Sequence, residues 1–358
     1  MRSAGSPESH RARSLRRSEC ASRHWVQWRA RRQHGCAMLR AVTGRLCAVS
    51  VDLDEIPHYY AIHGLAQPAG DAACAVYRLG VPRLRDLLRA YAAPATWFVV
   101  GADASIADNG ALLQQLGEAG DELGNHSLDH CYDLTRLGRA DLQRQVRAGA
   151  DAVEAATGRR PIGFRAPGYT VTDELFDALA DCDVIYDSSV FPCPIYYAAK
   201  LLAIARHRVR GRRSHAIVDQ PAVLRAPTEP YRVGRPYWRR GRGMLELPIQ
   251  VTRRLRLPFI GTVLTLAGPK RARWLARQVA RGGFVNLELH GLDALDGSDG
   301  LEALQPHQPD LRVKLERKLA ALGAVLEALR EAGYAFVRLD EAAEALDPAP
   351  AGHGAQGA

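Results

Sequence analysis

Short apolar runs alternate along the chain with longer segments whose apolar residues recur every three or four positions. The apolar runs have the length and composition of buried strands, and they cover residues 46–51, 95–100, 184–186, 284–289 and 334–339. The segments with a helical period cover residues 80–91, 112–119, 141–156, a stretch that begins at Thr172, and 311–329. Strands that alternate with helices predict one α/β domain rather than two separate domains.

Polar residues follow several of these apolar runs directly. Asp52 and Asp54 end the first strand, and His290 ends the strand predicted near residue 289. His126 and His130 are four residues apart, and on a single helical turn that spacing places both imidazoles on one face, where they can bind one metal ion. We therefore expect these side chains to meet in one site.

This set of residues suits the hydrolysis of an amide. A divalent metal held by Asp54, His126 and His130 would keep an open position, as catalytic zinc does, and its bound water would become more acidic. Asp52 is then the candidate base, and His290 is the candidate acid for the leaving nitrogen. Asp187 could hold His290 in the right tautomer and keep it protonated.

Two points about the ligands stay open. Glu55 follows Asp54 directly and is an alternative ligand to it. His58 and His63 rank below the other candidates, because no helical spacing in residues 56–70 aims them at the site. The non-functional alternative is that His126 and His130 are two polar residues on a surface turn.

The motifs NHSLDH at residues 125–130 and FRAPGY at residues 164–169 resemble those of the metal-dependent polysaccharide deacetylases, the NodB-homology or carbohydrate esterase 4 family. The resemblance runs from about residue 46 to residue 346. It implies a distorted (β/α)7-type barrel and one divalent metal ion, Zn²⁺ in our prediction. It assigns the base to Asp52, the metal to Asp54, His126 and His130, the orientation of the base to Arg165 and the acid to His290. It also implies an oxyanion contact from the backbone N–H at Tyr169, next to the turn that Pro167 fixes.

The chain departs from the family pattern at two places. Leu53 separates two aspartates that are more often adjacent in the family, and Glu288 stands where an apolar residue is usual. The resemblance implies removal of an N-acyl group, an acetyl group in our prediction, from an amino sugar of a cell-envelope glycan or a lipid-linked glycan precursor. The alternatives are a deformylase of a lipid-linked aminosugar, an amidase for a non-sugar amide, and a non-catalytic module that binds glycan or membrane.

Charge is distributed unevenly over the chain. The net charge is +9, yet residues 1–37 hold nine Arg against two Glu, and residues 200–242 hold twelve Lys or Arg against two acids. The rest of the chain is acidic, so a continuous nucleic-acid-binding face is not predicted. We expect instead that residues 200–242 contact an anionic membrane surface peripherally.

Composition also suggests how the chain is divided. Residues 1–37 lack a hydrophobic period and are expected to be a disordered extension, with Met38 as a candidate start of translation. Residues 38–346 form the predicted catalytic domain, with a basic insertion at about 194–280, and residues 347–358 a disordered tail.

The expected compartment is the cytoplasm, with a possible place at the inner face of the membrane. Seven cysteines without a CxxC pair fit reduced thiols. No apolar run approaches the roughly 20 residues of a membrane-spanning helix.

Overall fold

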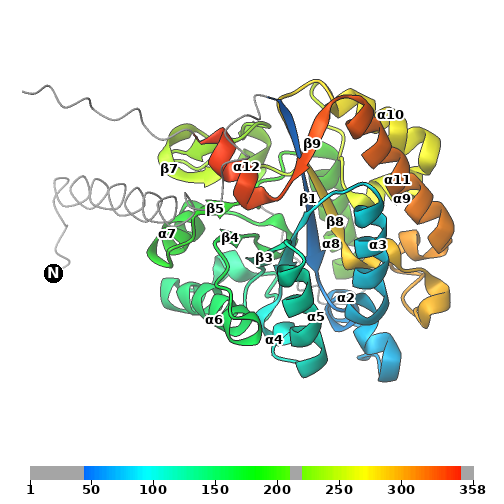
Figure 1. The fold of residues 1–358 in the computed structure, drawn as a ribbon. Helices are drawn as coiled ribbons and strands as arrows, with labels where there is room; N and C mark the ends of the chain where they lie inside the picture. Colours follow the sequence, from blue (N-terminus) through cyan, green and yellow to red (C-terminus); the bar gives the residue numbers. More distant parts are fainter. Residues whose placement is uncertain (1–43, 210–219, 348–358) are drawn as a thin grey trace, which may run out of the picture.

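A computed structural model describes residues 44–209 and 220–347 (Figure 1). The strands are β1 (Arg45–Leu53), β2 (Ala95–Val99), β3 (Glu122–Asn125), β4 (Gly163–Phe164), β5 (Tyr186–Asp187), β6 (Tyr231–Val233), β7 (Arg240–Glu246), β8 (Phe284–His290) and β9 (Tyr334–Val337). The helices are α2 (Ile56–His63), α3 (Val81–Ala90), α4 (Gly101–Ala104), α5 (Ala107–Glu118), α6 (Arg139–Thr157), α7 (Asp173–Asp181), α8 (Pro194–Val209), α9 (Gly261–Ala267), α10 (Pro269–Val279), α11 (Leu315–Glu331) and α12 (Leu339–Leu346).

The strands form one curled sheet in the order β6-β7-β5-β4-β3-β2-β1-β8, and β9 also pairs with β1. Every neighbouring pair is parallel except β6 and β7. β1 pairs with three strands, β2, β8 and β9, and eight of its nine residues are buried. Helices cover the outside of the sheet, with α3, α9, α10 and α11 on one side and α6 and α7 on the other (Figure 1).

The segment 247–251 closes the gap between the two ends of the curled sheet. The Ile249 amide donates to the Val190 carbonyl at 3.0 Å, and the Gln250 amide donates to the Asn286 carbonyl at 3.3 Å. The Asn286 side chain donates in turn to the Leu247 carbonyl at 3.0 Å. The result is the distorted (β/α)7-type barrel that the sequence predicted, whose parallel strands bring their carboxyl ends to one mouth.

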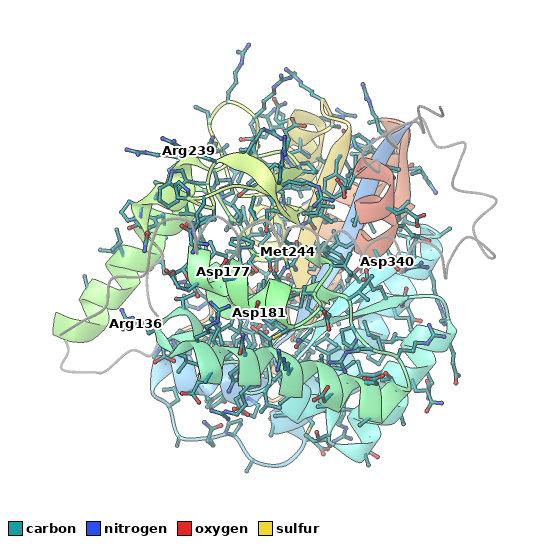
Figure 2. The ribbon with its side chains drawn as sticks, turned by 90° about the vertical axis from the view of Figure 1, so that its left-hand side faces the viewer. Arg136, Asp177, Asp181, Arg239, Met244 and Asp340 are labelled. Carbon is teal, nitrogen blue, oxygen red and sulfur yellow. The ribbon has the colours of Figure 1, made fainter. Side chains whose placement is uncertain are left out.

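The described part of residues 194–280 contributes several elements to the barrel. β7 pairs with β5, and α9 and α10 pack against each other and against α11. α8 is different, because it stands out from the body at the left of Figure 2, while α7, with Asp177 and Asp181, covers the face turned toward the viewer.

Several predicted ends shift in the structure. α5 begins at Ala107, five residues before the predicted start, and the predicted strand at 334–339 ends at Val337, where α12 soon follows. Asp347, expected in a disordered tail, is buried and pairs with Arg232. The other expected disordered residues, 1–37 and 348–358, lie outside the described residues.

In the part of the chain that the structure describes, no helix has both the length and the apolar composition needed to cross a bilayer.

Candidate active site

Asp54, His126 and His130 meet at the mouth of the barrel. Asp54 follows the end of β1, and His126 follows the end of β3. The Nε2 atoms of the two histidines lie 3.2 Å apart, and each lies 3.1 Å from Asp54 Oδ1. In a tetrahedral zinc site with bonds of about 2.0–2.1 Å, the ligand atoms lie roughly 3.3 Å from one another. The three side chains therefore fit one metal ion.

The hydrogen bonds around this triangle also suit a cation. The His126 Nδ1 lies 2.8 Å from the Arg165 carbonyl oxygen, so Nδ1 carries the proton and Nε2 presents its lone pair to the triangle. Asp54 Oδ1 is buried and accepts no hydrogen bond of normal geometry. A buried carboxylate oxygen without a donor is costly, and a bound cation would remove that cost.

The loop that carries the two histidines differs from the prediction. Residues 126–130 form a loop rather than a helical turn, and Ser127 and His130 have positive φ angles of 68° and 52°. The Asn125 side chain accepts from the Ser127 amide at 3.0 Å, and the Ser127 hydroxyl accepts from the His130 amide at 3.2 Å. These short-range bonds, rather than helical geometry, bring the two imidazoles together.

Asp52 and Arg165 form a buried ion pair beside the triangle. Arg165 Nη1 donates to Asp52 Oδ1 at 2.7 Å. The other guanidinium nitrogens donate to the Ser188 carbonyl, the Ser188 hydroxyl and the Ser50 hydroxyl. The guanidinium carbon also lies 4.3 Å from the centre of the Phe98 ring. Arg165 is thus held from several sides, and it fixes the position of Asp52.

His290 faces this pair from the end of β8. Its Nδ1 lies 3.0 Å from Glu288 Oε1, and its Nε2 lies 3.3 Å from the Tyr169 hydroxyl. The Tyr169 hydroxyl donates to the same Glu288 oxygen at 2.9 Å. Ligand atoms of Asp52, Glu288 and His290 all lie within 4.8 Å of one another.

Three comparisons place the chain among known proteins. A family model described as polysaccharide deacetylase matches residues 75–186. A peptidoglycan deacetylase of Helicobacter pylori is 25% identical over 147 residues, which are 40% of this chain and 49% of that protein. A peptidoglycan-N-acetylglucosamine deacetylase of Bacillus cereus is 33% identical over 95 residues, 26% of this chain and 43% of that protein.

The chain thus contains a polysaccharide deacetylase region, which spans residues 75–186. The matches span less than half the length of these curated relatives. A structure from Mycobacterium smegmatis, described as a polysaccharide deacetylase, superposes with a TM-score of 0.53 at 18% identity and covers 85% of this chain and 91% of that one. This likeness shows the barrel fold.

The matched polysaccharide deacetylase region contains only part of the site. It includes His126, His130, Arg165 and Tyr169. The carboxylates on β1 and the pair on β8 lie outside it. The folded chain brings both groups to the mouth that the matched region forms.

The structure does not pair Asp187 with His290, as the sequence led us to expect. Asp187 accepts from the Ser189 amide at 3.1 Å and from the Ser189 hydroxyl at 2.8 Å, and it shares a buried hydrogen bond with Glu246. Glu288 occupies the place next to His290 instead. The sequence held a signal for this, because residues two apart on a strand point to the same face.

Two further expectations differ from the structure. Glu55, the alternative ligand, accepts hydrogen bonds from the backbone amides of Ile56, Val76 and Tyr77. It therefore caps α2 and the start of the helical turn Val76–Gly80. Burial raises its pKa to about 7. The Tyr169 amide, expected to contact an oxyanion, donates to the Ala166 carbonyl at 3.0 Å within the turn that begins at Pro167.

Sequence reasoning ranked His58 too low as a neighbour of the site. Its ring centre lies 4.8 Å from that of His130, and its Nε2 lies 3.2 Å from Asp103 Oδ2. His58 therefore supports the His130 ring from α2. His63 lies farther along the helix, against His307.

The electrostatics differ between the two sides of the mouth. Burial lowers the pKa of His130 to about 4, so this imidazole is neutral at pH 7 and has a lone pair for a metal. Burial raises the pKa of Asp54, but His130 and His126 outweigh it and hold that pKa well below its usual range. Burial lowers the pKa of His290, but Glu288 outweighs it and raises that pKa well above its usual value. Burial lowers the pKa of His126, but Asp52 and Asp54 outweigh it and raise that pKa. One side thus combines an anionic Asp54 with a neutral His130, while the other side holds a proton on His290.

Proposed function

We propose that this protein is a metal-dependent hydrolase that removes an N-acetyl group from an amino sugar of a cell-envelope glycan. One observation carries the proposal: Asp54, His126 and His130 form a buried triangle at the mouth of the barrel, and ligand atoms of Asp52, Glu288 and His290 lie there within 4.8 Å of one another. Amide hydrolysis requires a base, an acid and stabilisation of the oxyanion, and these groups can supply all three.

Asp54, His126 and His130 would hold the divalent cation. When bound, such a cation supplies Lewis acidity toward the amide carbonyl and lowers the pKa of water in its open position. Zinc fits a site of two imidazoles and one carboxylate.

Asp52 would act as the base. Burial raises the pKa of Asp52, which favours uptake of a proton. Arg165 holds one oxygen of this carboxylate at 2.7 Å and so fixes its orientation. Asp52 then accepts the proton from the water that adds to the carbonyl carbon.

His290 would act as the acid. As the bond between the carbonyl carbon and the nitrogen breaks, His290 gives its proton to the departing nitrogen, and the products are a free amine and acetate. Glu288 keeps His290 protonated, and Tyr169 holds Glu288 in place.

The substrate class follows from the relatives. The two described above are named as deacetylases of peptidoglycan and of its N-acetylglucosamine. A chitooligosaccharide deacetylase of Sinorhizobium fredii also matches, at 33% identity over 101 residues, 28% of this chain and 46% of that protein. All three names point to an N-acetylated amino sugar in a glycan.

The test is to incubate the purified full chain, with and without zinc, with N-acetylglucosamine oligomers and with soluble peptidoglycan fragments. We expect zinc-dependent release of acetate and a matching loss of one acetyl group in the mass of the glycan. The matched control is Asp52→Asn, which keeps the triangle and should bind zinc without turnover. Release of formate from a formylated aminosugar, with no acetate from either glycan, would contradict the proposal and favour a deformylase.

A further inference from the structure

The exposed side of α8 is apolar, which is unusual for a surface helix. Ile195 is 51% exposed, Leu201 45% and Leu202 68%. The other α8 residues described as exposed are Pro194, Ala198, Ala199 and Ala205. Every exposed position described on this helix is therefore apolar, and such a surface marks an interaction site.

The opposite side of α8 faces the mouth of the barrel. Tyr196, Tyr197 and Lys200 line a small pocket together with Gly168 and Tyr169. Lys200 Nζ donates to the Gly168 carbonyl at 2.8 Å, and the Tyr196 ring centre lies 5.7 Å from that of Tyr169. The helix is thus attached to the turn that carries Tyr169, and it stands out from the body at the left of Figure 2.

The turn at residues 252–256 extends this apolar surface. Leu255 is 71% exposed, and Arg253 and Arg254 beside it are also exposed. The Cys193 thiol, just before α8, lies 3.2 Å from the Arg256 carbonyl oxygen, which places the turn at the start of the helix. Arg256 donates to the Leu224 and Ala226 carbonyls and anchors the turn to the body.

The charge on these two segments has one sign. The sequence contains no Asp or Glu from residue 189 to residue 218, and none from residue 247 to residue 287. Lys200, Arg253 and Arg254 are therefore the local charges on the described part of this surface, and all are cations. If a second copy of the chain packed face to face through the same surface, these cations would lie close together and repel one another. The charge therefore argues against a second copy as the partner.

We propose that the exposed side of α8 and the turn at residues 252–256 form a docking surface for an anionic lipid bilayer. Leucine and isoleucine enter the region between headgroups and acyl chains, while arginine and lysine contact the anionic headgroups. Because the other side of α8 lines the pocket at Tyr169, docking places the mouth of the barrel close to the bilayer. The surface thus determines where the protein finds its glycan, and its binding does not depend on the chemistry proposed above.

The experiment is cosedimentation of the full chain with vesicles of phosphatidylcholine alone or mixed with phosphatidylglycerol. We expect the wild type to sediment with the anionic vesicles, less so with the neutral ones, and less at higher salt. The double variant Leu201→Ser/Leu202→Ser should bind the anionic vesicles at least about tenfold more weakly, since two leucine side chains no longer leave water.

The matched control is Leu79→Ser/Ile106→Ser, which removes two exposed apolar side chains, 37% and 47% exposed, that lie far from α8 in the chain. It should bind vesicles as the wild type does. Because substitutions on α8 could disturb the helix, the loop variant Leu255→Ser/Arg253→Gln gives an independent reading, and it should also weaken binding.

Three results would overturn the proposal. The first is sedimentation of both the α8 variant and the loop variant at the wild-type level in physiological salt. The second is a wild type that binds neither kind of vesicle. The third is a wild type that forms dimers in sedimentation velocity and loses them in the Leu201→Ser/Leu202→Ser variant, which would assign the surface to a second copy.

Discussion

A buried acidic side chain lies at each end of β3, and the two carboxylates differ in the hydrogen bonds that they accept. Glu122 begins the strand and accepts hydrogen bonds from the Tyr186 hydroxyl at 2.8 Å, the Thr96 hydroxyl at 2.7 Å and the Asp340 amide at 2.9 Å. At the other end, Asp54 lies against His126, and its Oδ1 accepts no hydrogen bond of normal geometry. Both side chains are buried, so burial alone does not distinguish them.

The difference teaches which buried acid is prepared for chemistry. Burial and the nearby Asp340 raise the pKa of Glu122 to about 8, so this carboxyl prefers the protonated, fully bonded form. The pKa of Asp54 is held well below its usual range, because the histidines outweigh the effect of burial. A saturated acid stabilises the fold, whereas an acid left with an open oxygen is available to a ligand.

The largest effect should come from His126→Ala, which removes one corner of the triangle. We expect loss of the bound metal and a fall in activity to the level of the metal-free protein, because the Lewis acid and the activated water are lost together. Metal analysis after gel filtration and acetate release measure the two effects. If the variant kept full activity without metal, the open oxygen of Asp54 would not be a sign of metal binding, and the comparison with Glu122 would be wrong.

His290→Ala should come next. General acid catalysis is typically worth about 10²- to 10⁴-fold, and we expect a loss in that range with the metal content unchanged. The rate profile should also lose its alkaline limb, which reports loss of the proton from His290. A drop below about tenfold would assign the acid to another residue.

Glu288→Gln should have a smaller effect, of about 10- to 100-fold, as is usual for partners that orient a site residue. Glu288 raises the pKa of His290, and the acid must be protonated to work, so activity falls as pH rises through that pKa. Removing the negative charge should therefore move the alkaline limb to lower pH. The matched control Asp187→Asn should leave the limb in place, and the opposite pattern would restore Asp187 as the partner.

Glu122→Gln should have the smallest effect on activity, less than about twofold, and should act on stability instead. The pKa of Glu122 in the folded protein, about 8, lies above its ordinary value of 4.5. Its stabilising contribution is therefore full below about pH 4.5 and is lost as pH rises toward 8. Urea unfolding measures the free energy of unfolding at pH 5 and at pH 8.5. The change between these two pH values should be smaller for the variant than for the wild type. An equal difference would mean that Glu122 is ionised in the folded chain.

Local sequence patterns predicted much of the fold and one side of the site. The spacing of leucines predicted the helix that the structure shows as α11. Thr172 caps α7 as expected, because its hydroxyl accepts a hydrogen bond from the Leu175 amide. The spacing of His126 and His130 predicted that the two rings meet, and they do, although a loop rather than a helical turn brings them together. These predictions depend on residues close in sequence, where spacing restricts geometry.

The other side of the site depends on contacts between distant strands, which spacing does not restrict. Asp187 lies at the end of β5, and only the order of strands in the sheet decides whether it meets His290. Glu288 lies on the same strand as His290, two residues before it, and that local signal was overlooked. The helix α8 and its exposed apolar side were not predicted, because the membrane contact expected for residues 200–242 was based on charge alone. Basic charge in residues 200–242 was noted, but residues 210–219 of that segment lie outside the described residues.

Arg165 contacts two groups of the site, one through its backbone and one through its side chain. Its carbonyl oxygen meets the His126 ring, and its guanidinium meets Asp52. The first contact uses the backbone and the second uses the side chain, so a substitution at this position would change the support of Asp52 while leaving the backbone contact to His126 in place.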